Sequence, residues 1–431
     1  MALSLVPAAC GNEPRPATGP RTTPQPPTPT ASSAPTTAAP PTSTPRAAKD
    51  KRRADDLNGD GRADLIVEVG LPSKNLHYLA AVYGSPRGLD QRKKTIVPPD
   101  MFYPWLIGPS SRADLDGDGF GDIVGYGRPN THEDMRPHIF WGGPRGIDAT
   151  TLPTRMPLPM ESNVAANRAA AGDFDGDGNA DVAVSRPPAV GQGDATLMIL
   201  YGPFSREGVS SRQIVQESPT GDEFWRITVD KIKGRRATGL IVFERDDGEQ
   251  TSGWLLEAGP GGLSKQGYKL TKGMAAVFGD FDGDGSRDVA VGDDGSRNDE
   301  PGYETEAPSV SKTLTVYYGD GRTKTFKGTK GPAVSGDFNG DGRDDLAFGG
   351  AHPRYDSTRI SWGSSAGLRP GDGVHGLTQA MPLAAGDYDG DGDDELAFAS
   401  VSPAHAAGED RFEIFMTDGR RVLTRFKVSP D

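Results

Sequence analysis

The 431-residue chain has one cysteine, six histidines and only 7% aromatic residues. A single cysteine excludes an internal disulfide, and no run of about 18 apolar residues is present to span a membrane. The histidines are scattered and belong to no zinc-binding or phosphate-binding motif. Acidic residues outnumber basic ones by 60 to 47, giving a net charge of −13. This acidity argues against nucleic acid as a partner.

Glycine is abundant instead, with 58 residues, and six copies of one acidic nine-residue loop recur along the chain. The copies span residues 56–64, 114–122, 173–181, 280–288, 337–345 and 387–395. Side-chain oxygens at loop positions 1, 3, 5 and 9, with a backbone carbonyl at position 7, suit a hard cation, and glycine at position 6 permits the sharp turn. Oxygen ligands without imidazole or thiolate favour calcium over transition metals, and the flexible geometry favours it over magnesium.

The loops are not EF-hands, because position 12 is Val, Gly or Phe where an EF-hand needs a bidentate Glu. The alternative, acidic turns that bind nothing, suits one loop better than six. We therefore expect about six structural calcium ions. Their ligands, with position 7 acting through its carbonyl, are Asp56, Asn58, Asp60, Arg62, Asp64, Asp114, Asp116, Asp118, Phe120, Asp122, Asp173, Asp175, Asp177, Asn179, Asp181, Asp280, Asp282, Asp284, Ser286, Asp288, Asp337, Asn339, Asp341, Arg343, Asp345, Asp387, Asp389, Asp391, Asp393 and Glu395.

A short β-branched run follows each loop, so the loop is expected to join two strands. One step between loops is about twice the others, and residues 230–236 in its middle form a loop without ligands. Glycine turns such as 83–89, 141–147 and 362–368 follow at the same spacing. Seven repeats of about 55 residues predict an all-β, seven-bladed propeller with four-stranded blades, the loop lying between strands A and B. The ring is expected to close without exchanging a strand between its ends.

These loops and turns resemble the FG-GAP repeats, also called VCBS repeats, of integrin α-chain N-terminal propellers. The resemblance covers roughly residues 50–431. It implies structural calcium on the A–B face and ligand binding on the opposite face, at the D–A and B–C connections. Blade 4 departs from the family pattern and is expected to lack metal.

Three segments are expected along the chain. Residues 1–10 resemble a truncated lipoprotein signal ending at Cys10, the expected lipidation site, although the positive n-region is absent. Residues 11–48 are rich in Pro, Thr, Ala and Ser and predict a disordered linker. Residues 49–431 form the propeller. Calcium sites without disulfides favour an exported protein at the outer face of the membrane or in the cell wall.

No catalytic residue is expected. Residues 363–367 match the G-x-S-x-G pattern, but they occupy the register of a glycine turn, so we predict that the chain is not an enzyme. The expected function is a monomeric, lipid-anchored scaffold or adhesion module that binds a protein or glycan at the cell surface. The alternatives are a calcium-stabilised lectin for cell-wall or extracellular glycans and, third, a polysaccharide-degrading enzyme. Aromatic and polar residues in the variable connections suggest the ligand site, namely Tyr103, Trp105, His132, Arg354 and Tyr355.

Overall fold

The computed structural model describes residues 53–71, 76–98, 103–104, 112–128, 136–158, 169–186, 196–221, 224–232, 236–244, 249–298, 305–350, 357–377, 380–400 and 412–428. The chain divides into two compact units, Met1–Pro45 and Arg46–Asp431, and every described residue belongs to the second. The predictions for residues 1–48, Cys10 included, therefore lie outside the described residues. Within the described ranges, no helix has the length and apolar character needed to cross a membrane.

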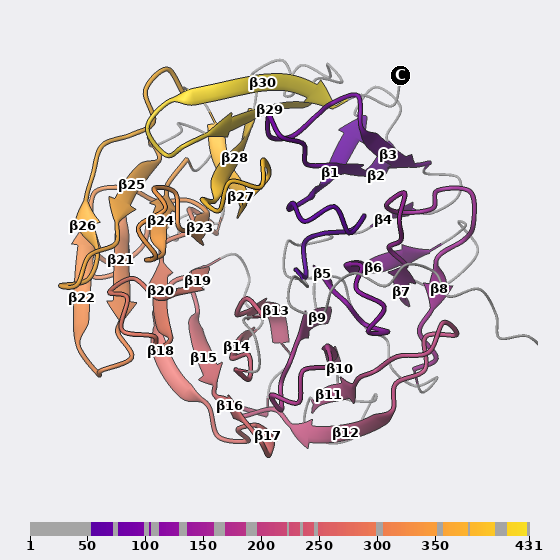
Figure 1. Ribbon diagram of the computed structural model, residues 1–431. Helices are drawn as coiled ribbons and strands as arrows, with labels where there is room; N and C mark the ends of the chain where they lie inside the picture. The colour runs from indigo at the N-terminus through magenta and orange to yellow at the C-terminus, as the bar shows by residue number, and fades with distance from the viewer. Residues whose placement is uncertain are drawn as a thin grey trace, which may run out of the picture. The chain divides into compact units, whose positions relative to one another are not determined.

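Seven antiparallel sheets follow one another around a ring and form the blades of a propeller (Figure 1). Blades 1 to 3 contain β1 (Leu65–Leu71), β2 (Leu76–Val82), β3 (Lys94–Val97); β4 (Tyr103–Pro104), β5 (Arg112–Ala113), β6 (Asp122–Arg128), β7 (Arg136–Phe140), β8 (Thr154–Arg155); and β9 (Ala169–Gly172), β10 (Asp181–Arg186), β11 (Thr196–Tyr201), β12 (Arg212–Glu217). Blade 4 contains β13 (Phe224–Val229), β14 (Leu240–Glu244), β15 (Ser252–Leu256) and β18 (Tyr268–Lys272), with β16 (Ala258–Gly259) and β17 (Gly262–Leu263) as a small hairpin.

Blades 5 to 7 contain β19 (Ala275–Gly279), β20 (Asp288–Gly292), β21 (Thr313–Tyr317), β22 (Thr323–Lys327); β23 (Ala333–Gly336), β24 (Asp345–Phe348), β25 (Arg359–Trp362), β26 (Arg369–Pro370); and β27 (Ala380–Gly386), β28 (Glu395–Ser400), β29 (Phe412–Thr417), β30 (Val422–Val428). The all-β, seven-bladed propeller predicted from the sequence is confirmed. In the described part of blade 1 three strands are present, and in blade 2 both β4 and β5 pair with β6.

The pattern of burial explains the strand sequences. The second and third strands of a blade are covered on both faces by neighbouring blades, so β10 and β11 are almost continuously buried and apolar. The outermost strands β12 and β18 instead carry mainly exposed polar residues. Charged side chains on such edge strands oppose pairing with another chain.

Each blade has two distinct ends because its strands form an antiparallel meander. Counting strands A to D outward from the centre, the A–B and C–D connections lie at one end, called here the loop face. The B–C and D–A connections lie at the opposite face. The acidic loops are A–B connections and the glycine turns are C–D connections, so both repeated motifs meet on the loop face.

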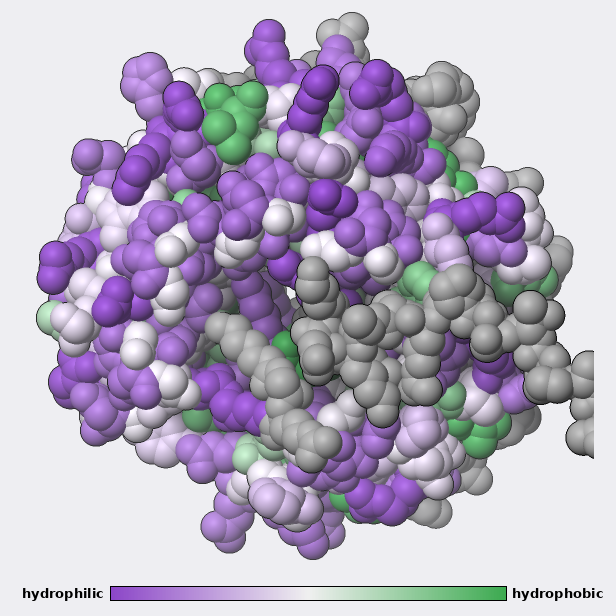
Figure 2. All heavy atoms as spheres, in the orientation of Figure 1, coloured by the Kyte–Doolittle hydropathy of each residue, from purple (hydrophilic) through white to green (hydrophobic). Residues whose placement is uncertain are grey.

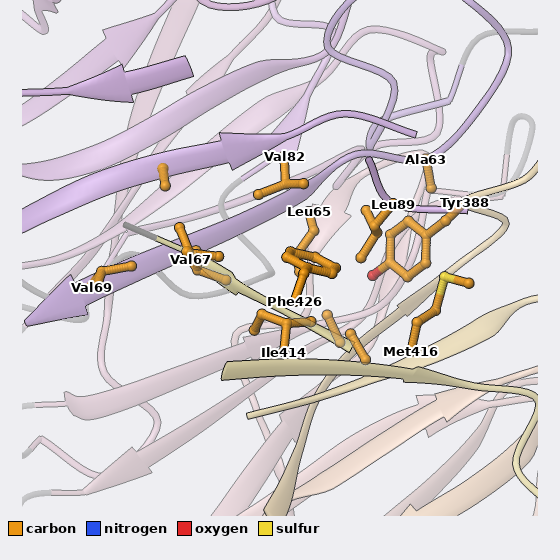
Figure 3. Packing of buried hydrophobic residues seen from close by; sticks show 14 of the residues in the cluster. Ala63, Leu65, Val67, Val69, Val82, Leu89, Tyr388, Ile414, Met416 and Phe426 are labelled. Carbon is orange, nitrogen blue, oxygen red and sulfur yellow. The ribbon is translucent and has the colours of Figure 1, made fainter. Parts of the chain in front are cut away.

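Side-chain packing joins blades 1 and 7, and the described residues include no strand exchanged between them (Figure 3). Leu65 and Val67 of β1 pack in one buried cluster with Ile414 of β29 and Phe426 of β30. Two backbone hydrogen bonds also cross this seam, from Ala63 N to Asp387 O at 2.9 Å and from Ser85 N to Tyr388 O at 3.1 Å. Residues 49–52, where the predicted propeller begins, lie outside the described residues, so closure without strand exchange stays a prediction.

A second contact repeats around the ring. The aromatic residue before a glycine turn reaches beneath the corresponding turn of the next blade, where a glycine leaves room for it. The Tyr83 hydroxyl accepts a hydrogen bond from Ile147 N at 2.9 Å, beside Gly146 with a φ of +79°. Tyr318 does the same with Leu368 N at 2.9 Å. At the closing seam, Met416 packs against Gly88 instead.

Gly146→Ala is expected to destabilise the fold by about 1–3 kcal/mol, because the added Cβ would overlap the Tyr83 hydroxyl in a left-handed backbone conformation. Gly143→Ala, in the same turn but with no heavy atom within 4 Å of the added Cβ, is the matched control and should change stability little. Urea unfolding of both variants measures the difference. Equal stabilities would contradict the role of this contact.

Candidate metal centres

The acidic loops fold around their own carboxylates. In loop 173–181, Asp173 accepts hydrogen bonds from Gly176 N at 2.7 Å and from Gly178 N at 3.0 Å. Both glycines have positive φ values, 74° and 90°, which L-amino acids with a Cβ rarely adopt. Glycine at position 4 is therefore as necessary as glycine at position 6, which the sequence analysis singled out.

The carboxylate at loop position 9 joins the two repeated motifs of a blade. Asp181 accepts one hydrogen bond from Phe174 N at loop position 2 and another from Gly202 N in the glycine turn, at 2.8 and 2.9 Å. The same pair of bonds is made by Asp64, Asp122, Asp288 and Asp345. Each of these five aspartates thus holds the A–B loop and the C–D turn together, whereas Glu395 accepts the loop bond from Tyr388 N at 2.9 Å.

Four loops bring three carboxylates together so that one oxygen from each lies within 4.8 Å of the others. These groups are Asp114, Asp116 and Asp122; Asp173, Asp175 and Asp181; Asp280, Asp282 and Asp288; and Asp387, Asp389 and Glu395. They are positions 1, 3 and 9 of the predicted ligand pattern. Loops 56–64 and 337–345 have Asn58 and Asn339 at position 3, so they supply two carboxylates at these positions.

The residues present fit a cation. One oxygen of Asp280 is buried and has no hydrogen-bond partner among the described residues, although its other oxygen accepts a bond from Gly285 N at 3.1 Å. An orphaned carboxylate oxygen beside two further carboxylates costs free energy unless a cation or a proton neutralises it. The position-5 carboxylates lie at the exposed side of the loops and accept the N–H of position 7, as Asp177 does from Asn179 N at 2.7 Å.

Burial raises the pKa of the position-9 carboxyls, with neighbouring carboxylates adding to the shift. The pKa is about 8 for Asp64, about 7 for Asp181 and Asp345, about 6 for Asp288 and about 8 for Glu395. Their backbone hydrogen bonds act in the opposite direction but do not overcome desolvation. Without a cation, Asp64 and Glu395 therefore favour the protonated form at neutral pH, whereas the carboxyl of Asp288 is mainly ionised there.

Arginines from the C–D hairpins lie over the outer side of three loops. Arg206 contacts Asp116 and Asp118 at 2.6 Å each and stacks 4.7 Å from the centre of the Trp141 ring. Arg212 and Arg322 pair in the same way with position 3 of their loops, at 3.1 and 2.5 Å. These arginines orient the position-3 carboxylates and lower the net negative charge of each loop.

Neighbouring loops are also joined directly. The carbonyl at position 1 accepts the backbone N–H of position 8 in the next blade, as in Gly121 N to Asp56 O at 2.7 Å and Asp394 N to Asp337 O at 2.8 Å. Blade 4 takes part through Thr238 N, which donates to Asp173 O at 2.7 Å. The geometry of one loop is therefore coupled to that of the next.

Comparison with known proteins identifies the repeat. An FG-GAP-like repeat model matches residues 114–184 and 337–398. Each match begins at the first position of one acidic loop and ends in the strand after the next loop. This chain is an FG-GAP repeat β-propeller. No curated protein matches the sequence.

Several solved structures are similar to this FG-GAP propeller at 12% identity. They include the exotype rhamnogalacturonan lyase YesX, with a TM-score of 0.42 over 85% of this chain and 71% of that one. The Bacillus licheniformis rhamnogalacturonan lyase PL11 has a TM-score of 0.41 over the same shares. The V. cholerae biofilm matrix protein Bap1 has a TM-score of 0.23 over 87% of this chain and 79% of that one. None of the three defines a substrate or partner for this chain.

The prediction that the chain is not an enzyme has to be corrected. Rhamnogalacturonan lyases are among the structures that its fold matches, so the absence of a catalytic motif in the sequence does not exclude catalysis. The physical reason is general. In a propeller, residues of separate blades can meet in one site, so their spacing in the sequence need not form a recognisable motif.

Blade 4 of the FG-GAP propeller replaces the acidic loop with a basic arrangement. Asp230, only 5% exposed, is paired with Arg236 at 3.1 Å and with Arg287 of blade 5 at 2.6 Å. Lys231 reaches Asp394 of blade 7 at 3.3 Å. In blade 4, basic side chains thus supply positive charge at the place where the other blades have acidic loops.

The predicted ligand residues fall mostly outside the described structure. Trp105, His132, Arg354 and Tyr355 lie outside the described residues. Tyr103 was expected in a connection but belongs to β4, where its backbone pairs with Arg128 of β6. Both β4 and β5 pair with β6 on the inner side of blade 2.

A cavity of about 920 Å³ occupies the centre of the ring. Its walls are mainly the apolar innermost strands, including Ala171, Val229 and Ala276. Arg53, Lys231 and Asp394 line it at the loop face. The lysine from blade 4 therefore crosses the cavity to reach blade 7 at that end.

Metal-free protein is expected to lose stability as the pH rises from about 5 to about 8. The position-9 carboxyls have folded-state pKa values of about 6 to 8, above the unfolded value of about 4. Stability from such groups is present at low pH and disappears as they ionise in the fold. Urea unfolding of chelator-treated, dialysed protein measures the trend. Saturating divalent cation should abolish or reverse it, and the same slope with and without cation would contradict the assignment.

Proposed function

We propose that this chain is a calcium-stabilised binding propeller of the cell exterior. The observation that carries the proposal is the set of four carboxylate groups, each at the same place in its blade and each partly buried. All-oxygen ligands in a glycine-rich, adaptable loop favour calcium. In this arrangement calcium is structural, because the ligands simultaneously hold the A–B loop, the C–D turn and the next blade.

The surface supports a polar ligand. The face seen in Figure 2 is largely hydrophilic, with hydrophobic residues in small, separate patches. Large hydrophobic side chains that are exposed among the described residues lie on four different blades: Leu152, Val209, Val215, Tyr268 and Leu423. Scattered apolar residues of this kind are usual on soluble proteins and do not mark a protein interface. A saccharide or a hydrophilic protein surface fits this face better than an apolar partner.

The calcium concentration outside the cell suits loops of this number and composition. Millimolar calcium outside the cell fills even weak sites, whereas cytosolic levels fill only tight ones. Six sites that stabilise a chain with one cysteine would take the place that disulfides have in many exported proteins. Location outside the membrane is therefore part of the proposal.

Calcium is expected to stabilise the fold by about 1.4 kcal/mol per site at ten times Kd. Loops 56–64 and 337–345 should bind most weakly, because asparagine at position 3 leaves three carboxylates instead of four. In loop 337–345 the Asn339 amide nitrogen also faces Asp345, at 3.2 Å. Calorimetric titration of the chain and of Asn339→Asp should show the weakest step becoming tighter.

Elemental analysis should give six calcium ions per chain. A seventh would contradict the metal-free blade 4, and a melting temperature unchanged by chelator would contradict structural calcium altogether.

Loop and opposite-face substitutions should separate stability from binding. Asp175→Ala removes a carboxylate from one metal group, so it should lower the melting temperature while folded protein keeps its ligand affinity. Trp105→Ala and Tyr355→Ala, predicted on the opposite face, should weaken binding by about 1–3 kcal/mol with little change in melting temperature. Binding to cell-wall and extracellular glycans measures the affinity, and product analysis of the same mixtures measures turnover. Affinity that follows calcium occupancy would place the ligand at the metal and overturn the structural role.

A further inference from the structure

A second, smaller pocket of about 190 Å³ lies between blades 5 and 6. Its lining comes from the starts of β21 and β25, the ends of β22, β24 and β26, and residues next to these strands. The end of strand D and the start of strand C both lie at the opposite face. The pocket therefore opens away from the metal loops, on the face where the FG-GAP resemblance places ligands.

Three basic side chains surround this pocket, Lys312, Lys327 and Arg359. Lys327 and Arg359 are exposed, and among the described residues no carboxylate lies within ion-pair distance of either. This differs from Arg322 in the same blade, which is paired with both Asp282 and Asp320 at 2.5 Å. Two cations without an acidic partner at one pocket create a local positive potential on an otherwise acidic chain.

The third base is held in an unusual backbone conformation. Lys312 has a φ of 53°, in the left-handed region that a residue with a side chain seldom occupies. Its N–H donates to Asp293 at 2.7 Å, and Gly328 N donates to its carbonyl at 2.9 Å. Asp293 is itself paired with Arg297 at 2.7 Å, so its charge is already balanced. Strain of this kind persists where surrounding contacts fix it, often at ligand sites.

The interior of the pocket is apolar. Leu314, Phe326 and Phe348 line it beneath the basic rim, and Ser361 adds one hydroxyl. Phe348 and Leu314 are buried in the core between the two blades. An aromatic surface below a cationic rim matches a ring that has an apolar face and carries an anionic group.

We propose that this pocket binds one uronic acid residue of an acidic saccharide. The sugar ring lies against Phe326 and Phe348, and its carboxylate is held by Arg359 and Lys327, since a guanidinium can bind a carboxylate through two parallel hydrogen bonds. The volume suits a single sugar residue, so neighbouring residues of the chain extend over the surface. This inference rests on the proposed binding function and names the chemical class of its ligand.

Calcium-loaded protein should bind short oligomers of glucuronic or galacturonic acid more tightly than the neutral glucose or galactose oligomers. Arg359→Gln and Lys327→Gln should each weaken binding to the acidic oligomers about tenfold or more. Arg359→Lys should retain part of the affinity. Lys272→Gln is the matched control, because Lys272 ends β18 in blade 4 as Lys327 ends β22 in blade 5. Its affinity should equal that of the unaltered chain, and the melting temperatures of all four variants should be unchanged.

Four other outcomes would contradict either the inference or the proposed function. Acidic oligomers that bind equally well to Arg359→Gln and Lys327→Gln would place the site elsewhere and overturn the inference. Inorganic phosphate that binds as tightly as the oligomers and displaces them would reduce the pocket to a simple anion site, which also overturns it. Tight binding of neutral glycans or proteins, with none of acidic oligomers, would overturn the inference while leaving the proposed binding function intact. No binding to any ligand would instead count against the proposed function.

Discussion

The fold depends on a buried carboxylate that each acidic loop presents at its ninth position. Asp181 and its equivalents accept hydrogen bonds from two separate segments of the same blade, and burial in this place disfavours their charge. The desolvation free energy of such a buried carboxylate is offset only when it binds a proton or a cation. A blade with an ionised carboxylate and no cation keeps its hydrogen bonds but carries an uncompensated buried charge, so a cation bound in the loop would stabilise the loop face.

Two repeated contacts on the loop face join neighbouring blades. One is the backbone bond between adjacent loops, and the other is the aromatic residue inserted beneath the next glycine turn. Such nearest-neighbour coupling resembles that of repeat proteins, in which stability is shared through interfaces. Blade 4 makes both contacts with blade 3, since Thr238 N donates to Asp173 O and Tyr201 lies against Gly262. Its arginine pairs with Asp230 maintain the charge balance.

The sequence was sufficient for the fold because its signals are local and repeated. Ligand spacing, glycine positions and the aliphatic runs after each loop lie within a few residues of one another, and their recurrence defines the blades. The link from Asp181 to Gly202 was not predicted, because a hydrogen bond between residues 21 apart leaves no local pattern. Arg206 was missed for the same reason, as it reaches Asp118 from another blade. Tyr103 was expected in a connection because a two-residue strand is too short to show an alternation of apolar and polar residues.

The seam between blades 1 and 7 has a mechanical consequence. Every other pair of neighbouring blades is joined by continuous polypeptide, whereas this pair is held by side-chain packing, two backbone hydrogen bonds and the ion pair of Arg53 with Asp387 at 2.9 Å. Among the described residues, a force that separates blades 1 and 7 is therefore opposed by non-covalent contacts alone. A cation held in loop 387–395, whose first residue is the partner of Arg53, would raise the force needed to open the ring at this junction.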